Sequence, residues 1–129
     1  MRRDPDLIRA LILKLEDYPL PFGAVAYFNI GDPDVTIEGY EPDQVGYHGR
    51  LLVDAGYIDE PDSRPMGGFA FRGLTWAGHD FADSIRDPEV WKKTKGGAAA
   101  AGGWTLDLLK DLAKGLLKKK IEEHTGVSL

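Results

Sequence analysis

The chain has 129 residues, 43% of them hydrophobic and 29% charged, with no cysteine and a formal net charge of −5 at pH 7. The lack of cysteine excludes disulfides, thiolate zinc sites, iron–sulfur clusters and a cysteine nucleophile. No run approaches the ~20 apolar residues of a membrane span, and Arg9 and Lys14 interrupt the first apolar run, so we expect a cytoplasmic protein with no signal peptide and no membrane partner.

Charge is distributed unevenly along the chain. Residues 35–62 carry seven acids against Arg50 alone, whereas residues 91–120 carry eight lysines against Asp107 and Asp111. We therefore expect an acidic middle and a basic end, which would attract different partners.

The first predicted element is a helix over residues 5–16. Asp4 suits its start, and leucine and isoleucine recur at helical spacing as far as Leu15. Two β-prone runs follow, at 24–30 and 35–37, on either side of a Gly-Asp-Pro-Asp sequence. We interpret them as a small hairpin in the place where a helix-turn-helix protein has its second helix.

The central predicted element is a helix over residues 42–55, followed at once by a two-stranded ribbon. A proline suits the first turn of this helix, and Gly56 supplies the left-handed residue that ends it. Residues 57–60 and 69–72 are predicted to pair as antiparallel strands across a Pro/Gly loop. A helix, a ribbon and a further helix capped by Thr75 is the order found in the second half of a winged helix.

The C-terminal part is predicted to be helical. A helix over 75–86 and a short one beginning at Pro88 precede a glycine and alanine tract, which predicts a flexible linker or a frayed helix. Thr105 then caps a last helix with leucines on one side and lysines on the other. The predicted α+β organisation is a winged-helix-like domain at 1–95, a Gly/Ala linker at 96–103, and a C-terminal amphipathic helix at 104–129 that packs on the domain or on a second subunit.

Several stretches carry a resemblance to a known family. The longest are Leu51-Leu-Val-Asp-Ala-Gly-Tyr-Ile58 and Gly73-Leu-Thr-Trp-Ala-Gly-His-Asp-Phe81, with shorter ones at 3–8, 37–40, 47–48 and 83–87 and at Trp91. Together they resemble the DUF2513 family of small proteins, common in bacteriophages, prophages and other mobile elements. This resemblance covers nearly the whole chain and implies a fold without an established activity. The helix-to-wing portion is also similar, more loosely, to winged-helix repressors of the arsenic-repressor type, although Gly49 stands where they carry a core leucine.

The first functional hypothesis is a phage or mobile-element DNA-binding regulator that dimerises through its last helix. The central helix would enter the major groove, with Arg50 contacting guanine and Tyr47 a phosphate. Arginines of the ribbon and lysines of the last helix would add phosphate contacts, although a lysine stripe is commonly just a solvated face. The candidate nucleic-acid-binding residues are Tyr47, Arg50, Arg64, Arg72, Lys118, Lys119 and Lys120.

The second hypothesis is a protein-binding winged helix that engages a host or phage protein through an acidic face. Two of the four outward positions on the central helix are carboxylates, which disfavour contact with a duplex. The candidate partner-binding residues are Glu41, Asp43, Tyr47 and Asp54.

An enzyme is not expected, nor is a cofactor or a bound metal. His48 falls on the apolar side of the central helix and is interpreted as a packing residue, with a proton-linked switch as the alternative. His79 with Asp80 resembles paired metal ligands, but few further ligands are available in the chain. The sequence contains no P-loop, dinucleotide-binding glycine pattern or activated serine motif.

Overall fold

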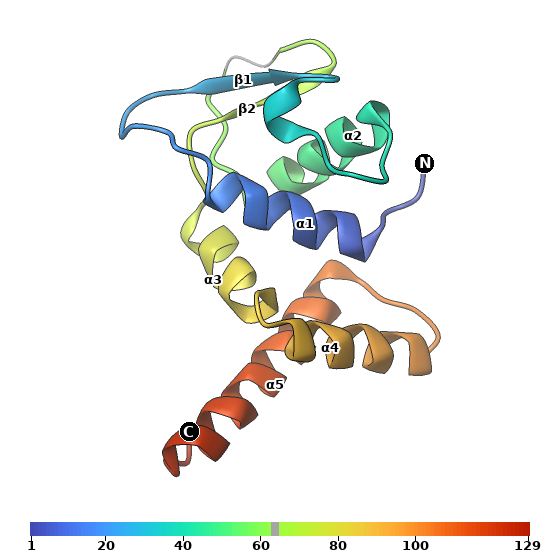
Figure 1. Cartoon of the computed structure of the whole chain (residues 1–129), viewed down its shortest axis with the longest axis vertical. Coiled ribbons are helices and arrows are strands. Elements are labelled where there is room, and N and C mark those ends of the chain that lie inside the picture. Colours follow the sequence, from blue (N-terminus) through green and yellow to red (C-terminus); the bar gives the residue numbers. More distant parts are fainter. Residues whose placement is uncertain (63–64) are drawn as a thin grey trace. The chain divides into compact units, whose positions relative to one another are not determined.

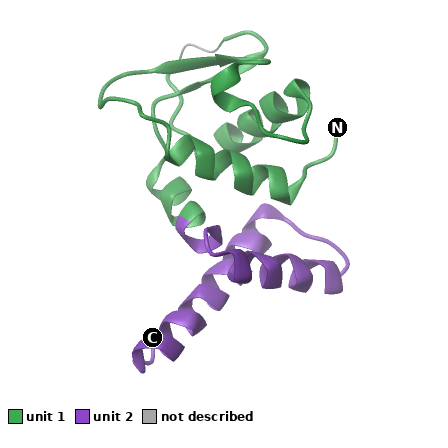
Figure 2. Ribbon diagram, in the orientation of Figure 1, with its two compact units in different colours: residues 1–82 green, residues 83–129 purple. Residues whose placement is uncertain are grey.

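Five α-helices, one 3-10 helix and a two-stranded antiparallel sheet make up the α+β fold in the computed structural model, which describes residues 1–62 and 65–129. In chain order the elements are α1 (Pro5–Glu16), β1 (Ala26–Asn29), η1 (Pro33–Val35), α2 (Pro42–Asp54), β2 (Gly68–Phe71), α3 (Trp76–Ile85), α4 (Pro88–Ala100) and α5 (Leu106–Thr125) (Figure 1). None of the helices in the described part of the chain is long and apolar enough to cross a membrane. Residues Met1–Ala82 form unit 1 and residues Asp83–Leu129 form unit 2 (Figure 2).

Local capping sets the ends of α1 and α2, as predicted. The Asp4 carboxylate accepts hydrogen bonds from two backbone N–H groups in the first turn of α1. At the start of α2, the Gln44 side chain accepts from the Glu41 N–H, and Gly56, with φ +81°, follows its end. These signals lie within a few residues of each terminus, so they can be read from the sequence.

His48 joins α1 to α2 as a fully buried packing residue, at 0% exposure. Its Nε2 accepts a hydrogen bond from the Asp4 N–H at 2.8 Å, so the ring proton sits on Nδ1, which donates to the Gln44 carbonyl at 2.7 Å. Both ring nitrogens of the neutral imidazole are therefore satisfied, and the packing interpretation of His48 accounts for its position.

The predicted hairpin between 24–30 and 35–37 is wrong. Residues 33–35 form η1, because a proline occupies its first position and the Asp32 carboxylate accepts from the Asp34 N–H. Strand β1 pairs instead with β2, with Phe28 opposite Phe69 in an antiparallel register. The two phenylalanines are buried on one face of the sheet, with their ring centroids 5.4 Å apart.

The ribbon after α2 exists, but its register differs from the predicted pairing of 57–60 with 69–72. Ile58 forms an isolated bridge with Leu74, the Asp59 N–H donates to the Gly73 carbonyl, and the Arg72 N–H donates to the Asp59 carbonyl. The observed pairing is shifted toward the C-terminus relative to the predicted one, with Ile58 opposite Leu74. The segment from 68 to 74 therefore has β1 along one edge and residues 57–59 along the other.

Gly49 allows β2 to pack directly on α2. A Cβ at this position would lie 2.2 Å from a ring carbon of Phe69, far inside van der Waals contact. The Phe69 ring thus occupies the space where a helical leucine side chain would stand, which explains the departure from the repressor pattern at Gly49.

In unit 2, α4 and α5 pack against each other. The sequence predicts either a flexible linker or a frayed helix for the glycine and alanine tract at 96–103. In the structure this tract is helical through Ala100, the last residue of α4. Leu109 and Ala113 of α5 are buried, and a Cβ at Gly97 would lie 2.8 Å from a methyl carbon of Leu112. The boundary between the two units lies before residue 83, whereas the sequence places domain boundaries at 95 and 103; that division into folding domains stays a prediction.

Candidate interaction surface

One stripe of α2 faces away from the core of unit 1. Positions 43, 46, 47, 50 and 54 follow the three- and four-residue spacing of one helix face. We call the residues Asp43, Gly46, Tyr47, Arg50 and Asp54, together with Ile30, which lies against Gly46, the α2 face. Asp43, Tyr47 and Asp54 are exposed on it, so the structure brings three of the four predicted partner-binding residues onto one stripe, with Glu41 at the cap of the same helix.

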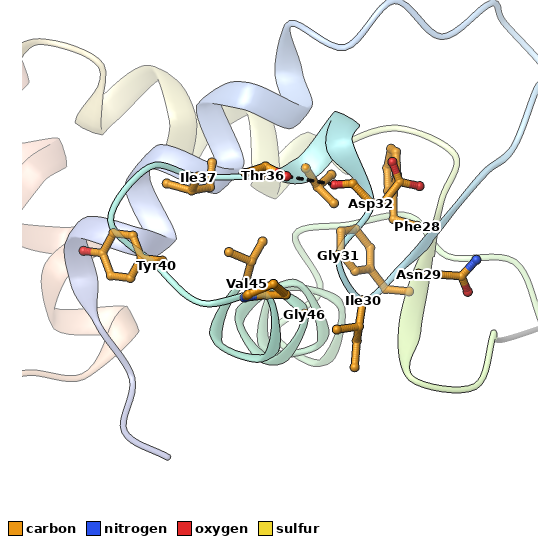
Figure 3. Close-up of a pocket in the computed structure, with 13 residues that line it drawn as sticks. Phe28, Asn29, Ile30, Gly31, Asp32, Thr36, Ile37, Tyr40, Val45 and Gly46 are labelled. Carbon is orange, nitrogen blue, oxygen red and sulfur yellow. Dashed lines mark hydrogen bonds between the residues drawn. The ribbon is translucent and has the colours of Figure 1, made fainter.

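Ile30 adds an apolar group that the sequence analysis did not identify. A Cβ at Gly46 would lie 3.3 Å from the Ile30 side chain, so this glycine lets Ile30 pack closely against α2 (Figure 3), and a Cβ at Gly67 would lie 3.6 Å from the same side chain. The side chain nevertheless remains 48% exposed, and Tyr47, the residue after Gly46 in α2, is 37% exposed. No sequence signal links Ile30 to α2, since the contact joins residues that are distant in the chain.

The hollow beside Ile30 does not suit a small molecule. It lies between the end of β1, η1 and the first turns of α2, and its walls include Val35, Tyr40 and Val45 (Figure 3). Its volume of about 20 Å³ suffices for roughly one water molecule, whereas ligand pockets are more than tenfold larger. The α2 face is therefore suited to surface contact and not to enclosing a ligand.

Arg50 is held by unit 1 itself. Its guanidinium donates to both carboxylate oxygens of Glu60, at 3.2 and 3.1 Å, and to the Gly68 carbonyl at 2.7 Å. Glu60, whose side chain is 5% exposed, also accepts from the Ala70 N–H at 3.3 Å. Through the bond from Ala70 to Glu60, the contacts along this edge of β2 extend one residue beyond 57–59. A bidentate contact of Arg50 with guanine would require the arrangement to break.

Of the two ribbon arginines that the sequence predicts as nucleic-acid contacts, the structure describes Arg72. Arg72 donates two hydrogen bonds to Asp59, at 3.2 and 2.9 Å, and this bonding raises the pKa of Arg72 above its ordinary value. Arg64 lies outside the described residues. Of the predicted nucleic-acid contacts in unit 1, Arg50 and Arg72 are therefore both paired with carboxylates.

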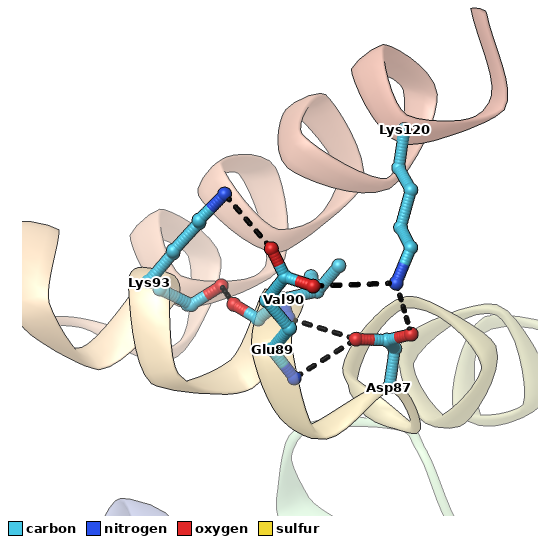
Figure 4. Close-up of polar contacts among 6 residues, drawn as sticks. Asp87, Glu89, Val90, Lys93 and Lys120 are labelled. Atoms are coloured by element: carbon cyan, nitrogen blue, oxygen red, sulfur yellow. Dashed lines mark hydrogen bonds and ion pairs between the residues drawn. The ribbon is translucent and has the colours of Figure 1, made fainter. Parts of the chain in front are cut away.

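The three predicted lysines lie in unit 2, on α5. Lys120 pairs with Asp87, the N-cap of α4, and with Glu89, which also pairs with Lys93 (Figure 4). The hydrogen bond between Lys120 and Asp87 raises the pKa of Lys120 and lowers that of Asp87. Lys118 and Lys119 are exposed. The structure thus divides the predicted nucleic-acid set between the two units.

The two units also differ in charge. Residues 1–82 contain seven lysines and arginines against fourteen aspartates and glutamates, whereas residues 83–129 contain nine against seven. The acidic excess belongs to the unit that carries the α2 face. Anionic ligands are repelled by such a field, and cationic ones are attracted.

His79 is held by Glu16 and not by a metal-binding cluster. Its Nδ1 lies 3.0 Å from a Glu16 carboxylate oxygen. Among the residues that the structure describes, no group of three or more histidines and carboxylates could hold a metal ion.

In comparisons with known proteins, the matched residues include the whole α2 face. The family model described as "Hypothetical protein (DUF2513)" matches residues 2–104, which include all of unit 1 except Met1, and all of α4. An uncharacterized protein of Haemophilus influenzae is 32% identical to this chain over 124 residues, which cover 94% of this chain and 99% of that relative. No solved structure matches the chain.

Proposed function

Because the chain belongs to the DUF2513 family, and the matched region contains the whole α2 face, we propose that it is a winged-helix-like module that binds a protein partner through this face. One observation carries the proposal. Ile30, packed on α2 at Gly46, and Tyr47 are exposed apolar groups between Asp43 and Asp54 along α2, on a unit that has twice as many acidic as basic residues. Exposed aromatic and aliphatic groups with a polar rim are typical of protein interfaces.

The order of elements in unit 1 supports the winged-helix part of the proposal. α1, β1, a short helical turn and α2 precede the ribbon, and the segment 68–74 lies between β1 and 57–59. In this interpretation η1 takes the place of the second helix of a helix-turn-helix, α2 takes the position of the recognition helix, and the ribbon formed by 57–59 and 72–74 takes the position of the wing strands.

A DNA-binding regulator is the second candidate, and the lysines of unit 2 favour it. Lys118 and Lys119 are exposed on α5, and unit 2 has a small positive excess. Phosphate contacts would then come from α5 and not from the α2 face, whose carboxylates would meet a strongly negative duplex. For this reason we rank protein binding first.

A pair of experiments tests the proposal. A photo-crosslinking amino acid at position 47, in cells that express the protein, should yield a discrete adduct that disappears when Ile30→Asp is added. The same amino acid at Lys92, which is exposed on α4, serves as the control. Adducts that are identical at both positions would remove the α2 face as the working surface.

The companion measurement is a fluorescence-anisotropy titration with a mixed-sequence DNA duplex. We expect no saturable binding at about 150 mM salt, and any binding at about 50 mM should depend on Lys118 and Lys119. Saturable binding that Tyr47→Ala weakens at both salt concentrations would favour DNA reading by α2 and contradict the protein-binding assignment.

A further inference from the structure

We propose that the partner segment bound by the α2 face is basic, with cationic residues at both ends of an apolar anchor; this inference rests on the proposed function. It specifies the chemistry of the partner, a polypeptide segment of another protein. Three features of the surface carry it: an apolar centre, carboxylates at its two ends that have no partner among the described residues, and the unfavourable position of one of them.

The apolar centre receives the anchor. Ile30 packs against α2 at Gly46 (Figure 3), and the next residue of the helix is the exposed Tyr47, so both apolar side chains lie between Asp43 and Asp54 along α2. Arg50, the cation of this stripe, does not repel a basic segment strongly, because the Glu60 carboxylate neutralises it at 3.1 Å. The centre is therefore apolar and close to neutral, while the ends are negative.

Asp43 and Asp54 provide the negative ends. Within the described residues neither carboxylate makes a hydrogen bond or an ion pair with a side chain. Asp43 lies in the first turn of α2, where the helix dipole stabilises an anion. Its presence has a structural explanation, and by itself it indicates no ligand.

Asp54 has no such explanation. It is the last residue of α2, and the last turn of this helix contains no basic residue. The C-terminal end of a helix dipole is negative, so an exposed carboxylate there is unfavourable in the free protein. A cation from a partner would offset both the charge of Asp54 and the negative end of the dipole. We therefore assign Asp54 to binding and not to stability.

The spacing of the two carboxylates limits the partner further. Asp43 and Asp54 are eleven positions apart in α2, which corresponds to roughly 16 Å along the axis at about 1.5 Å per residue. A helical partner lying along α2 would match this with cations about eleven residues apart, and an extended partner with cations about five apart. The apolar anchor falls between the two cations in either case.

Two labelled peptides serve as probes. One is an alanine-based helix of about 16 residues with arginines eleven positions apart and a central leucine and phenylalanine, and the other has glutamates in place of the arginines. Anisotropy should show the arginine peptide binding at least about tenfold more tightly than the glutamate peptide, with an affinity that falls as salt rises. Equal affinities, or no binding of either peptide at about 1 mM, would overturn the inference.

Variants of the protein locate the binding. Asp54→Lys should weaken the arginine peptide about tenfold or more, and should also raise the melting temperature of the free protein, because a cation suits the end of α2. Asp54→Asn, which removes the charge alone, should weaken binding less. Asp111→Lys makes the same charge change at an exposed position of α5 and should alter affinity less than about twofold.

The outcomes separate this inference from the proposed function. A loss of binding in Asp54→Lys without a rise in melting temperature would contradict the argument from the helix dipole. A crosslinked adduct at position 47 that Ile30→Asp abolishes and Asp54→Lys leaves unchanged would keep protein binding and overturn the basic partner. Self-association that Asp54→Lys abolishes would assign the surface to a second copy of this chain, which also overturns it.

Discussion

Replacing Gly49 by alanine should destabilise unit 1, although the same change in an ordinary helix is stabilising. Gly49 is a buried residue within α2. Alanine has the higher helix propensity, by about 1 kcal/mol, so propensity alone predicts a gain. The added Cβ, however, would lie 2.2, 2.4 and 2.9 Å from three ring carbons of Phe69.

The size of the loss of stability depends on how far the Phe69 ring and α2 can move to relieve the overlap. Ordinary van der Waals contact begins near 3.4 Å, so the Phe69 ring or α2 must shift by more than an ångström. Phe69 is 1% exposed and packs on Phe28, and the hollow that both rings line has a volume of only about 20 Å³, so the ring cannot move this far without displacing its neighbours. Overpacking of this kind costs about 3 kcal/mol, and the helix gain offsets about 1, which leaves a net loss of about 2 kcal/mol.

Gly115→Ala is the matched control. Gly115 lies within α5, and among the described residues no atom outside its chain neighbours and the backbone of its own helix lies within 4 Å of an added Cβ. Urea unfolding followed by circular dichroism should show Gly115→Ala stabilised by up to about 1 kcal/mol and Gly49→Ala destabilised by about 2. A Gly49→Ala protein as stable as the original would refute the close packing of Phe69 on α2.

Three further predictions concern ion pairs and assembly. Arg50→Ala should lower the free energy of unfolding by about 2 kcal/mol in urea titrations, because it removes the charge that compensates the largely buried Glu60; a change below about 0.5 would contradict this. The hydrogen bond from Lys120 lowers the pKa of Asp87 below its ordinary value of 3.8. The stabilisation from this pair should therefore be fully present above pH 3.8 and should be lost as the pH falls through the lowered pKa. Asp87→Asn, which keeps the capping group, should reduce that acid sensitivity in thermal melts across pH. Sedimentation at tens of micromolar tests the predicted homodimer. Leu108→Glu, on the exposed side of α5, should give monomers. An unmodified chain that is already monomeric would contradict the predicted dimer.

The helices could be predicted from the sequence because their signals are local. Asp4, Gln44, Asp87 and Thr105 each cap a helix through groups two or three residues away, and Gly56 ends one through its own backbone conformation. The acidic stripe of α2 could likewise be predicted, since helical spacing places its residues on one side. Membership of the family was also predicted from the sequence, and the matched family confirms it.

The sheet and the centre of the candidate surface depend on contacts between distant residues. β1 pairs with β2 across about forty residues, whereas the β-prone run at 35–37 forms no strand, because Val35 is the last residue of η1 and Thr36 its C-cap. Likewise, the sequence alone indicates neither the ion pair between Arg50 and Glu60 nor the packing of Ile30, which was predicted as a strand residue, against Gly46. Side-chain periodicity reports which face of an element is apolar, but only packing decides which partner that face meets and which groups remain exposed.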